Sequence, residues 1–329
     1  MTYIDHDNTD PCFNFAAEEY FMSEKDAGDD SLFMFWRTKP TLMIGRFQNT
    51  VEEINTAYAE QNGIHIVRRN SGGGTIYTDE KTWQFSFIIK NYDKNECGFR
   101  SFTQPIVDSI RKAGICAEFG GRNDLLIAGK KFSGNAQFRR QNAMVHHGSI
   151  LYATDLEALV KSISVCDDKI VSKGIKSVRE RVTRIADHLA EPPAETAFKN
   201  AMVESILQNG ASVYRLSPGD IERIERIADT KFRSWDWNYG RSPAFDIQRK
   251  KRFASGAIGV KLKITKGIIE SCTFYGDFFA AGDTIEEAEK ALCGLRYEKK
   301  HIAARIAEKK LHTAFYSLSA EELLASIIE

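Results

Sequence analysis

The sequence predicts an α+β protein with two domains, a large one over residues 1–245 and a small one over residues 246–329. The chain has 329 residues, and about 150 residues per domain is typical of globular proteins. Segments with strand-like alternation are interspersed with segments of helical spacing. Residues 235–253 are aromatic, interrupted by Gly and Pro, and then basic, as interdomain connections often are. We therefore expect mixed sheets flanked by helices, followed by a smaller α+β unit.

The large domain begins with a helix and continues mainly with strands. The helix opens at Asn14, where a capping residue precedes a run of helix formers. The spacing over residues 101–114 predicts a helix, and residues 123–140 predict a hairpin that turns at Ala128 and Gly129. β-Branched and aromatic runs predict further strands over residues 31–36, 40–49, 63–70, 75–79, 82–89 and 144–153. Two more helices are expected within residues 155–163 and 189–212.

The small domain is predicted to hold a hairpin and two helices. Residues 259–265 and 268–278 predict two strands joined by a turn at Lys266 and Gly267. Alternation in the first strand places three apolar residues on one face: Val260, Leu262 and Ile264. The two helices have capping-box spacing, Thr284 with Glu287 and Ser319 with Glu322.

Composition excludes several classes of protein. Lys+Arg and Asp+Glu both number 45, so the formal charge of zero argues against a nucleic-acid protein that works by bulk charge. The six cysteines form no CxxC pair, so zinc-ligand spacing is absent. The N-terminal stretch is polar and acidic, unlike a signal peptide, and no run approaches the roughly 18 apolar residues of a membrane span. We expect a reduced, cytoplasmic, soluble protein.

Three consecutive glycines, Gly72–Gly74, follow Arg68 and Arg69. A glycine triplet on its own is typical of a tight turn, but the preceding guanidinium groups and exposed N–H groups suit a phosphate or carboxylate. P-loops and dinucleotide-binding folds place a helix after their glycines, whereas strands are expected on both sides here. The pattern predicts a strand–loop–strand anion site.

Lys130 and Lys131 follow the turn of the predicted hairpin. Lysines at a hairpin tip are ordinarily solvated. The residues that follow are small or polar, which leaves room for a narrow ligand: Ser133, Gly134, Asn135 and Ala136. Asn123 and Asp124, just before the hairpin, either form a turn or supply hard oxygen ligands for Mg²⁺.

These motifs resemble lipoate–protein ligases, in the superfamily that also holds biotin ligases and octanoyltransferases. The resemblance covers nearly the whole chain and rests on stretches in the family's order: WRTKPTLMIGRFQNTVEEIN, RRNSGGGTIYTD, GRNDLLIAGKKFSGNAQ, HHGSILYATDLEAL, KGIKSVRERVTRI and WDWNYGRSPAF. It implies a large biotin/lipoate-ligase-like catalytic domain with a small C-terminal accessory domain. The implied activity uses ATP and Mg²⁺ to convert lipoate to lipoyl-AMP. The lipoyl group then passes to a lysine of an acceptor, either a lipoyl domain or a glycine-cleavage H-type protein.

The resemblance also assigns roles to residues. It makes Lys131, just before FSGNA, the catalytic lysine and leaves Lys130 at the surface. It places Mg²⁺ on Asp124 and Asn123, and it makes residues 173–185 an adenylate-binding loop that closes over the intermediate. The implied nucleotide contacts are Arg69, Gly74, Thr75, Ile76, Tyr77, Lys131, Lys173, Ser177, Val178 and Arg181. The implied lipoate contacts are Arg69, Ser71, Gly72, Gly73, Gly74, Lys131, Ser133 and Gly134. His146 and His147 receive no catalytic role.

Four residues depart from the family's pattern. Thr78 stands where His is common, Lys81 and Thr82 stand for Gly-Asn, and Gln84 stands where Asn is frequent. These positions lie beside the glycine loop, so substrate or acceptor preference can differ from the family's.

Two alternatives to the ligase stay open. One is an ATP-independent octanoyl or lipoyl transferase between carrier proteins, and the other is a non-catalytic binding protein that kept the pocket. The ligase is favoured because residues 250–329 are present and because Cys116 and Cys166 lie outside the recognised motifs. The basic run at residues 248–252 either docks an acidic lipoyl domain or solubilises a hinge. The sequence does not decide between lipoate and octanoate, nor which acceptor is used.

Overall fold

In the computed structural model, the chain folds into two compact units, Met1–Asn238 and Tyr239–Glu329. The predicted boundary after residue 245 falls inside the second unit, and the roles given to the two domains remain predictions. The structure describes residues 1–27, 31–91, 98–121, 123–140, 142–163, 178–207, 211–242, 245–253, 256–276, 284–315 and 318–328. Within these ranges, no helix is long and apolar enough to cross a membrane.

The first unit is built on an eight-stranded sheet with the strand order β11-β1-β2-β6-β10-β9-β8-β7. Its strands are β1 (Thr2–Asp5), β2 (Ser31–Arg37), β6 (Thr82–Lys90), β7 (Ala117–Gly120), β8 (Asp124–Ile127), β9 (Lys130–Arg140), β10 (Ala143–Leu151) and β11 (Ser212–Arg215). β1 runs parallel to β2 and β11, and the remaining pairs are antiparallel. The prediction of a mixed sheet is therefore confirmed, whereas the short strands β1, β7 and β11 were not predicted.

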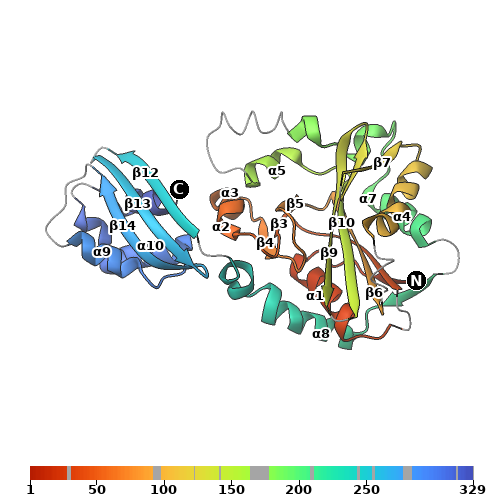
Figure 1. Cartoon of the computed structure of the whole chain (residues 1–329), viewed down its shortest axis with the longest axis horizontal. Helices are drawn as coiled ribbons and strands as arrows, with labels where there is room; N and C mark the ends of the chain where they lie inside the picture. The colour runs from red at the N-terminus through yellow and green to blue at the C-terminus, as the bar shows by residue number, and fades with distance from the viewer. Residues whose placement is uncertain are drawn as a thin grey trace. The chain divides into compact units, whose positions relative to one another are not determined.

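Alternation along the central strands builds one apolar layer on each face of this sheet. On β2, Met34 and Trp36 point to a cluster with helices α1 (Pro11–Ser23) and α8 (Pro218–Ile227). Phe33 and Phe35 point to the opposite cluster, with α4 (Phe99–Lys112) and α7 (Glu195–Leu207). Figure 1 shows these two pairs of helices on opposite sides of β9 and β10. The unit is thus a helix–sheet–helix sandwich, as expected for strands that are apolar on both faces.

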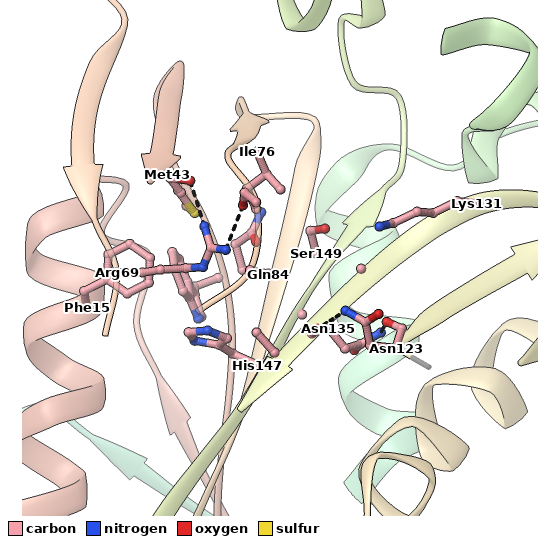
Figure 2. A pocket seen from close by; sticks show the side chains of 16 residues that line it. Phe15, Met43, Arg69, Ile76, Gln84, Asn123, Lys131, Asn135, His147 and Ser149 are labelled. Carbon is pink, nitrogen blue, oxygen red and sulfur yellow. Dashed lines mark hydrogen bonds between the residues drawn. The ribbon is translucent and has the colours of Figure 1, made fainter. Parts of the chain in front are cut away.

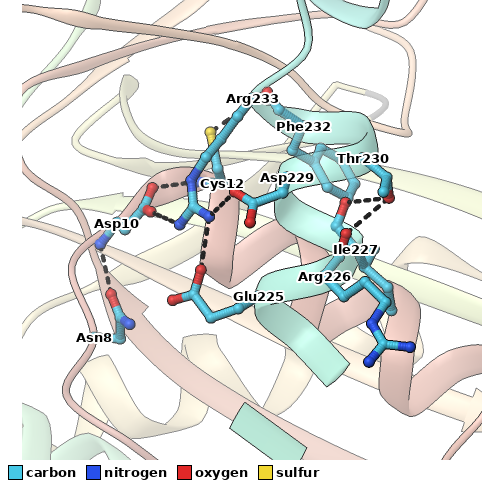
Figure 3. Close-up of polar contacts among 10 residues, drawn as sticks. All are labelled: Asn8, Asp10, Cys12, Glu225, Arg226, Ile227, Asp229, Thr230, Phe232 and Arg233. Atoms are coloured by element: carbon cyan, nitrogen blue, oxygen red, sulfur yellow. Dashed lines mark hydrogen bonds and ion pairs between the residues drawn. The ribbon is translucent and has the colours of Figure 1, made fainter. Parts of the chain in front are cut away.

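A polar cluster fixes the start of α1 against the end of α8. Asp10 caps α1 by accepting a hydrogen bond from the Cys12 N–H at 2.8 Å, and its carboxylate also pairs with Arg233. Arg233 in turn pairs with Glu225 and Asp229, both at 2.6 Å (Figure 3). The cluster positions α1, which carries side chains of the site described below.

A second, three-stranded sheet has the order β4-β3-β5 and carries the glycine loop. Its strands are β3 (Thr41–Ile44), β4 (His65–Arg68) and β5 (Ile76–Thr78), and the loop joins β4 to β5. The predicted strands 40–49 and 63–70 end earlier than expected, at Ile44 and Arg68. A small apolar cluster includes residues of this sheet, of helices α3 (Thr56–Gln61) and α5 (Leu156–Ile163), and Ile54, which directly follows the short helix α2 (Thr50–Glu53). Short helical turns lie at Ile185–His188, Ala228–Phe232 and Asp236–Gly240.

The second unit holds a three-stranded antiparallel sheet and three helices. They are β12 (Phe245–Phe253), β13 (Gly256–Thr265), β14 (Ile268–Gly276), α9 (Thr284–Leu292), α10 (Lys299–Lys309) and α11 (Ala320–Ile328), with a turn at Leu311–Ala314. The predicted hairpin is confirmed, and Val260, Leu262 and Ile264 are all buried. The predicted Ser319–Glu322 capping box is also confirmed, with hydrogen bonds of 2.9 and 3.1 Å.

One expectation for this unit was wrong, and one helix was not predicted. Residues 235–253 were expected to be a connection, but residues 245–253 form strand β12, paired with β13. β12 is an edge strand, where a run of Lys and Arg is a common protection against unwanted pairing, so its basic composition resembled a solvated linker. The helix α10 was missed because its many charged residues left little apolar signal.

Candidate active site

A pocket of about 550 Å³, part of it open to solvent, lies between the glycine loop and the large sheet, on the face that α1 covers. Figure 2 shows Arg69 of the loop on one side and Lys131 of β9 on the other, with Ser149 of β10 between them. We call residues 69–76 the glycine-loop wall, and Asn123, Asp124 and residues 131–136 the lysine wall. The pocket is lined by Phe15, Trp36, Met43, Arg69, Gly73, Gly74, Ile76, Gln84, Asn123, Lys131, Gly134, Asn135, Ala136, His147, Gly148 and Ser149.

Arg69 holds the glycine-loop wall together. Its Nη2 donates to the carbonyl oxygens of Gly72 and Gly74, both at 2.8 Å, and its Nη1 donates to Met43 O at 2.7 Å. The side chain is only 6% exposed. Burial lowers the pKa of Arg69 to about 10, against the raising effect of nearby Glu18, so the guanidinium stays charged at neutral pH. Arg69 therefore places a positive charge at the pocket, on a guanidinium group that hydrogen bonds already hold in place.

The three loop glycines differ in what they require. Gly73 has a φ of +95°, a backbone conformation that residues other than glycine rarely adopt. Its carbonyl oxygen lies 2.0 Å from the position that a Cβ atom on Gly45 would occupy. A Cβ on Gly72 would meet Phe47 at an ordinary 3.7 Å, and one on Gly74 would meet nothing within 4 Å. Gly73 and Gly45 are thus needed for the loop's shape, while Gly74 leaves open space on the pocket side.

A chain of buried hydrogen bonds connects this wall to α1. Arg69 Nε donates to Ser71 Oγ at 3.1 Å, and Ser71 Oγ lies 2.6 Å from His147 Nε2. His147 Nδ1 lies 2.9 Å from Glu18 Oε1, which also accepts from Ser86 Oγ at 2.6 Å. A proton on His147 Nδ1 is donated to Glu18, and Nε2 meets the Ser71 hydroxyl. The chain of contacts thus links the Arg69 guanidinium to the Glu18 carboxyl group.

Arg68, the other arginine before the glycines, has a different role from the one predicted. It is fully buried, and its Nη1 donates to the carbonyl oxygens of Gly45, Arg46 and Gln48 at 2.7–3.1 Å. Its Nη2 donates to Thr50 Oγ1 at 2.6 Å. The expectation that both arginines offer donors to an anion is therefore wrong for Arg68. Arg68 is the last residue of β4 and Arg69 follows it, so the two neighbouring side chains point to opposite sides.

The lysine wall is more open. Lys131 Nζ pairs with Asp124 Oδ1 at 2.7 Å, and the two side chains are 39% and 35% exposed. A Cβ on Gly134 would lie 2.8 Å from that ammonium, so Gly134 makes the space that the Lys131 side chain uses. Lys130 points elsewhere and donates to Arg179 O at 3.1 Å. The structure thus places Lys131 in the pocket and Lys130 outside it.

Asn123 and Asn135 brace the two strands of this wall. Asn123 Nδ2 donates to Asn135 O at 2.8 Å, and Asn135 Nδ2 donates to Asn123 O at 3.0 Å. The side-chain oxygen of Asn135 is buried without a partner among the described residues. Polar atoms of this wall therefore remain available to a bound molecule.

The end of the predicted adenylate-binding loop lies beside Lys131. Thr183 N–H donates to Lys131 O at 2.9 Å, and Val182 forms a parallel bridge with Lys131. Val178 and Arg181 precede this bridge and are not in the pocket lining. Lys173 and Ser177 lie outside the described residues. The nucleotide roles of these four residues remain predictions.

Other predicted residues support the pocket without lining it. Ser71 and Ser133 are buried beside it, and Thr75 donates to Gln48 Oε1 at 3.0 Å. The side chain of Tyr77 requires a correction, because it packs in the small apolar cluster of the second sheet and not in this pocket. Alternation along β5 explains it, since Ile76 faces the pocket and its neighbour must face away.

Sequence reasoning missed several pocket residues on the large sheet, among them Gln84, His147 and Ser149. The signal was the period-two alternation of β10, which separates His147 from His146. His146 lies on the opposite face among aromatic rings, and its ring centroid is 5.1 Å from that of Phe102. Burial lowers the pKa of His146 to about 3. Of the four departures from the family's pattern, only Gln84 lines the pocket.

Cysteines supply no nucleophile to the pocket within the described part of the chain. Cys12, Cys116, Cys272 and Cys293 are free thiols, and none of them is a lining residue. Cys116 is exposed near the end of α4, away from the pocket lining. Cys166 lies outside the described residues.

Comparison with known proteins matches both units. The family model described as the lipoyl protein ligase A/B catalytic domain matches residues 10–207, and that described as the bacterial lipoate protein ligase C-terminus matches residues 242–327. The chain is 38% identical to a lipoate-protein ligase of Bacillus subtilis, over 98% of this chain and 99% of that protein. It is 37% identical to lipoate–protein ligase 1 of Staphylococcus aureus, over 98% and 99% of the two chains.

A solved structure shares the fold of most of this chain. It is the bipartite lipoate protein ligase of Thermoplasma acidophilum, described with its E2 lipoyl domain. The match has a TM-score of 0.66 and 27% identity, and it covers 73% of this chain and 96% of that one.

Proposed function

This chain belongs to the lipoyl protein ligase A/B family, and we propose that it activates lipoate with ATP and then transfers the lipoyl group to a lysine of an acceptor protein. The observation that carries the proposal is the ammonium of Lys131 in the pocket, facing a glycine loop already braced by Arg69. The family relation makes the chain an enzyme of the lipoate–protein ligase type, and the residue roles below are part of the proposal.

In the first step, a carboxylate oxygen of lipoate attacks the α-phosphorus of ATP. The new P–O bond forms the acyl-adenylate, and the bond to the bridging oxygen breaks as pyrophosphate leaves. Both reactants are anions, so positive charge must offset their repulsion and stabilise the charge on phosphorus. Lys131 suits this because a compact ammonium can contact the acyl oxygen and the phosphate together.

The glycine-loop wall holds the acyl end in place during this step. Gly74 leaves open space at the pocket. The conformation of the loop is fixed because Arg69 donates hydrogen bonds to Gly72 O, Gly74 O and Met43 O. A preformed wall lowers the reorganisation required when charge develops. Because the wall is preformed, we also assign to it the contacts with lipoate and the nucleotide that the family resemblance implies for residues of this loop.

Mg²⁺ fits the lysine wall. Asp124 is about one-third exposed, and Asn123 uses its Nδ2 in a bond to Asn135 O, which leaves its side-chain oxygen as a ligand atom. No cluster of three or more His, Cys, Asp or Glu side chains occurs among the described residues. That agrees with Mg²⁺, which usually binds through one or two carboxylates together with substrate phosphates. When bound there, it would neutralise phosphate charge.

In the second step, the amine of an acceptor lysine attacks the activated carbonyl carbon. A C–N bond forms, the C–O bond to AMP breaks, and the amine loses a proton as AMP departs. The Thermoplasma acidophilum relative is described with a lipoyl domain, which supports a lipoyl-domain acceptor for this chain. An H-type carrier protein and a cytoplasmic location belong to the proposal as well.

Pyrophosphate release tests the proposal. The enzyme is incubated with ATP, Mg²⁺ and lipoate, and a lipoyl domain is added afterwards. We expect pyrophosphate before the acceptor is present, and a lipoyl mass increase on the acceptor afterwards. Modification that requires an acyl-carrier donor and proceeds without ATP would instead support the transferase, and absence of both products would support a binding protein.

A further inference from the structure

Gln84 has a buried side-chain amide nitrogen without a hydrogen-bond partner in the part of the chain that the structure describes. It lies in the middle of β6, is only 3% exposed and lines the pocket. Its Nε2 is fully buried and has no hydrogen-bond partner among the described residues. A buried donor without a partner costs roughly 1–3 kcal/mol, so such a group in a pocket calls for an explanation.

The sheet register places this amide level with the lysine wall. Gln84 is paired with Ser149 on β10, and Ser149 is paired with Gly134 on β9. The would-be Cβ of Gly134 lies 2.8 Å from Lys131 Nζ. Figure 2 shows Ser149 between Gln84 and Lys131. A single cross-strand row therefore carries Gln84 at one end and the ammonium at the other.

The chemistry of the donor decides what it can bind. Lipoate offers two kinds of acceptor, the carboxyl oxygens and the sulfurs, and its methylene chain offers none. Sulfur is a weak acceptor, while a carboxylate oxygen is a strong one. Because Gln84 shares its row with the space beside Lys131, an oxygen held there lies between the ammonium and the amide.

We propose that Gln84 is a substrate-binding residue whose Nε2–H donates a hydrogen bond to the acyl oxygen, first of the carboxylate and then of the adenylate's carbonyl group. The inference rests on the proposed function and adds a specific contact to it. It assigns recognition of the acyl head, and not of the acyl tail, to a residue on the large sheet.

The test uses Gln84→Leu, which keeps the size of the side chain but removes the amide. Calorimetric titration with lipoate and with octanoate gives Kd for two ligands that share a carboxylate and differ in their tails. We expect Kd to rise about tenfold for both, because one hydrogen bond to a charged acceptor is lost. The melting temperature of the ligand-free protein should not fall, since the buried Nε2–H makes no hydrogen bond to lose and an unpartnered buried donor is itself destabilising.

Gln137→Leu is the matched control. Gln137 Nε2 lies 3.0 Å from His146 Nδ1 on β10, and Gln137 is not a pocket residue. This variant should show the opposite pattern, a lower melting temperature with the Kd of both ligands unchanged.

The outcomes separate this inference from the proposed function. Unchanged Kd values in Gln84→Leu would overturn the inference. A weaker affinity for lipoate alone would also overturn it, because the amide would then contact the sulfur-containing ring of lipoate and not the carboxylate that both acids share. A ligand-free melting temperature that falls as it does in Gln137→Leu would also overturn it. If wild-type enzyme binds neither acid and releases no pyrophosphate, the proposed function itself fails.

Discussion

The two walls of the pocket are built in opposite ways. In the glycine-loop wall, Arg69 is buried and its donors are satisfied by Ser71 Oγ and by carbonyl oxygens of the chain. In the lysine wall, Lys131 is 39% exposed and pairs with Asp124, which is itself 35% exposed. One wall is complete before any ligand arrives, and the other keeps its charges accessible.

This difference separates the residues that shape the site from those that react in it. A buried guanidinium is stable only where its hydrogen bonds are made, so Arg69 cannot be freed without disturbing the loop. A half-exposed ammonium loses little on changing partners, so Lys131 can move from Asp124 to a substrate oxygen. Damage to the first wall should therefore reduce stability, and damage to the second should reduce rate.

The largest effect is expected from Lys131→Ala. It should lower the rate of adenylate formation by at least about 100-fold, because a charge that stabilises the transition state is removed. Its free energy of unfolding should change by less than about 1 kcal/mol, since the ion pair with Asp124 is exposed. Pyrophosphate release and urea denaturation measure the two quantities.

Lys130→Ala is the control for that variant. Lys130 contacts Arg179 O outside the pocket, so the variant should keep the wild-type rate. Comparable loss in both variants would show that the roles of the two lysines have been assigned wrongly.

Arg69→Met should have the next largest effect, this time on stability. Loss of the guanidinium leaves the carbonyl oxygens of Met43, Gly72 and Gly74 without their donor and leaves Glu18 without its balancing charge. We expect about 3 kcal/mol less free energy of unfolding in urea, together with lower activity. A variant as stable as wild type but inactive would show that the two walls do not differ as described.

Acid should destabilise the protein through a histidine on the opposite face of β10. Burial lowers the pKa of His146 from 6.5 to about 3, so the unfolded chain takes up its proton at a higher pH than the folded one. This contribution to stability is therefore present above pH 6.5 and is lost as pH falls below it. Between pH 7.5 and 5.5 the loss should be about 1.3 kcal/mol.

His146→Phe tests this pH dependence. The variant should lose about 1 kcal/mol less than wild type over the same pH interval, measured by urea denaturation at each pH. The remaining decline includes His6, whose pKa burial lowers to about 4. Equal slopes in the two proteins would show that His146 does not titrate in this way.

Asp124→Asn should change stability as little as Lys131→Ala does, because it breaks the same ion pair. The partly exposed pair with Lys131 should contribute at most about 1 kcal/mol, so the unfolding midpoint should barely move. The Mg²⁺ concentration for half-maximal pyrophosphate release should rise severalfold, since one anionic ligand is lost. A wild-type Mg²⁺ dependence would remove Asp124 from the proposed metal site.

Local patterns were enough to predict much of the fold. The hairpin that presents Lys131 was predicted from its turn at Ala128 and Gly129, which both have positive φ in the structure. The strands on both sides of the glycine loop were predicted in the same way. The strand β12 and the helix α10 were missed, because edge strands and exposed helices carry little apolar pattern.

The sequence by itself determined the family, the mixed α+β architecture and the segments from which the site is built, because these depend on motifs and on periodicity along the chain. Tertiary structure alone decided which of two neighbours faces the ligand. It placed Arg69 at the pocket and buried Arg68 behind it, and it brought His147 and Gln84 to the pocket face. The physical reason is that the facing direction of a strand residue depends on register with strands far away in the sequence.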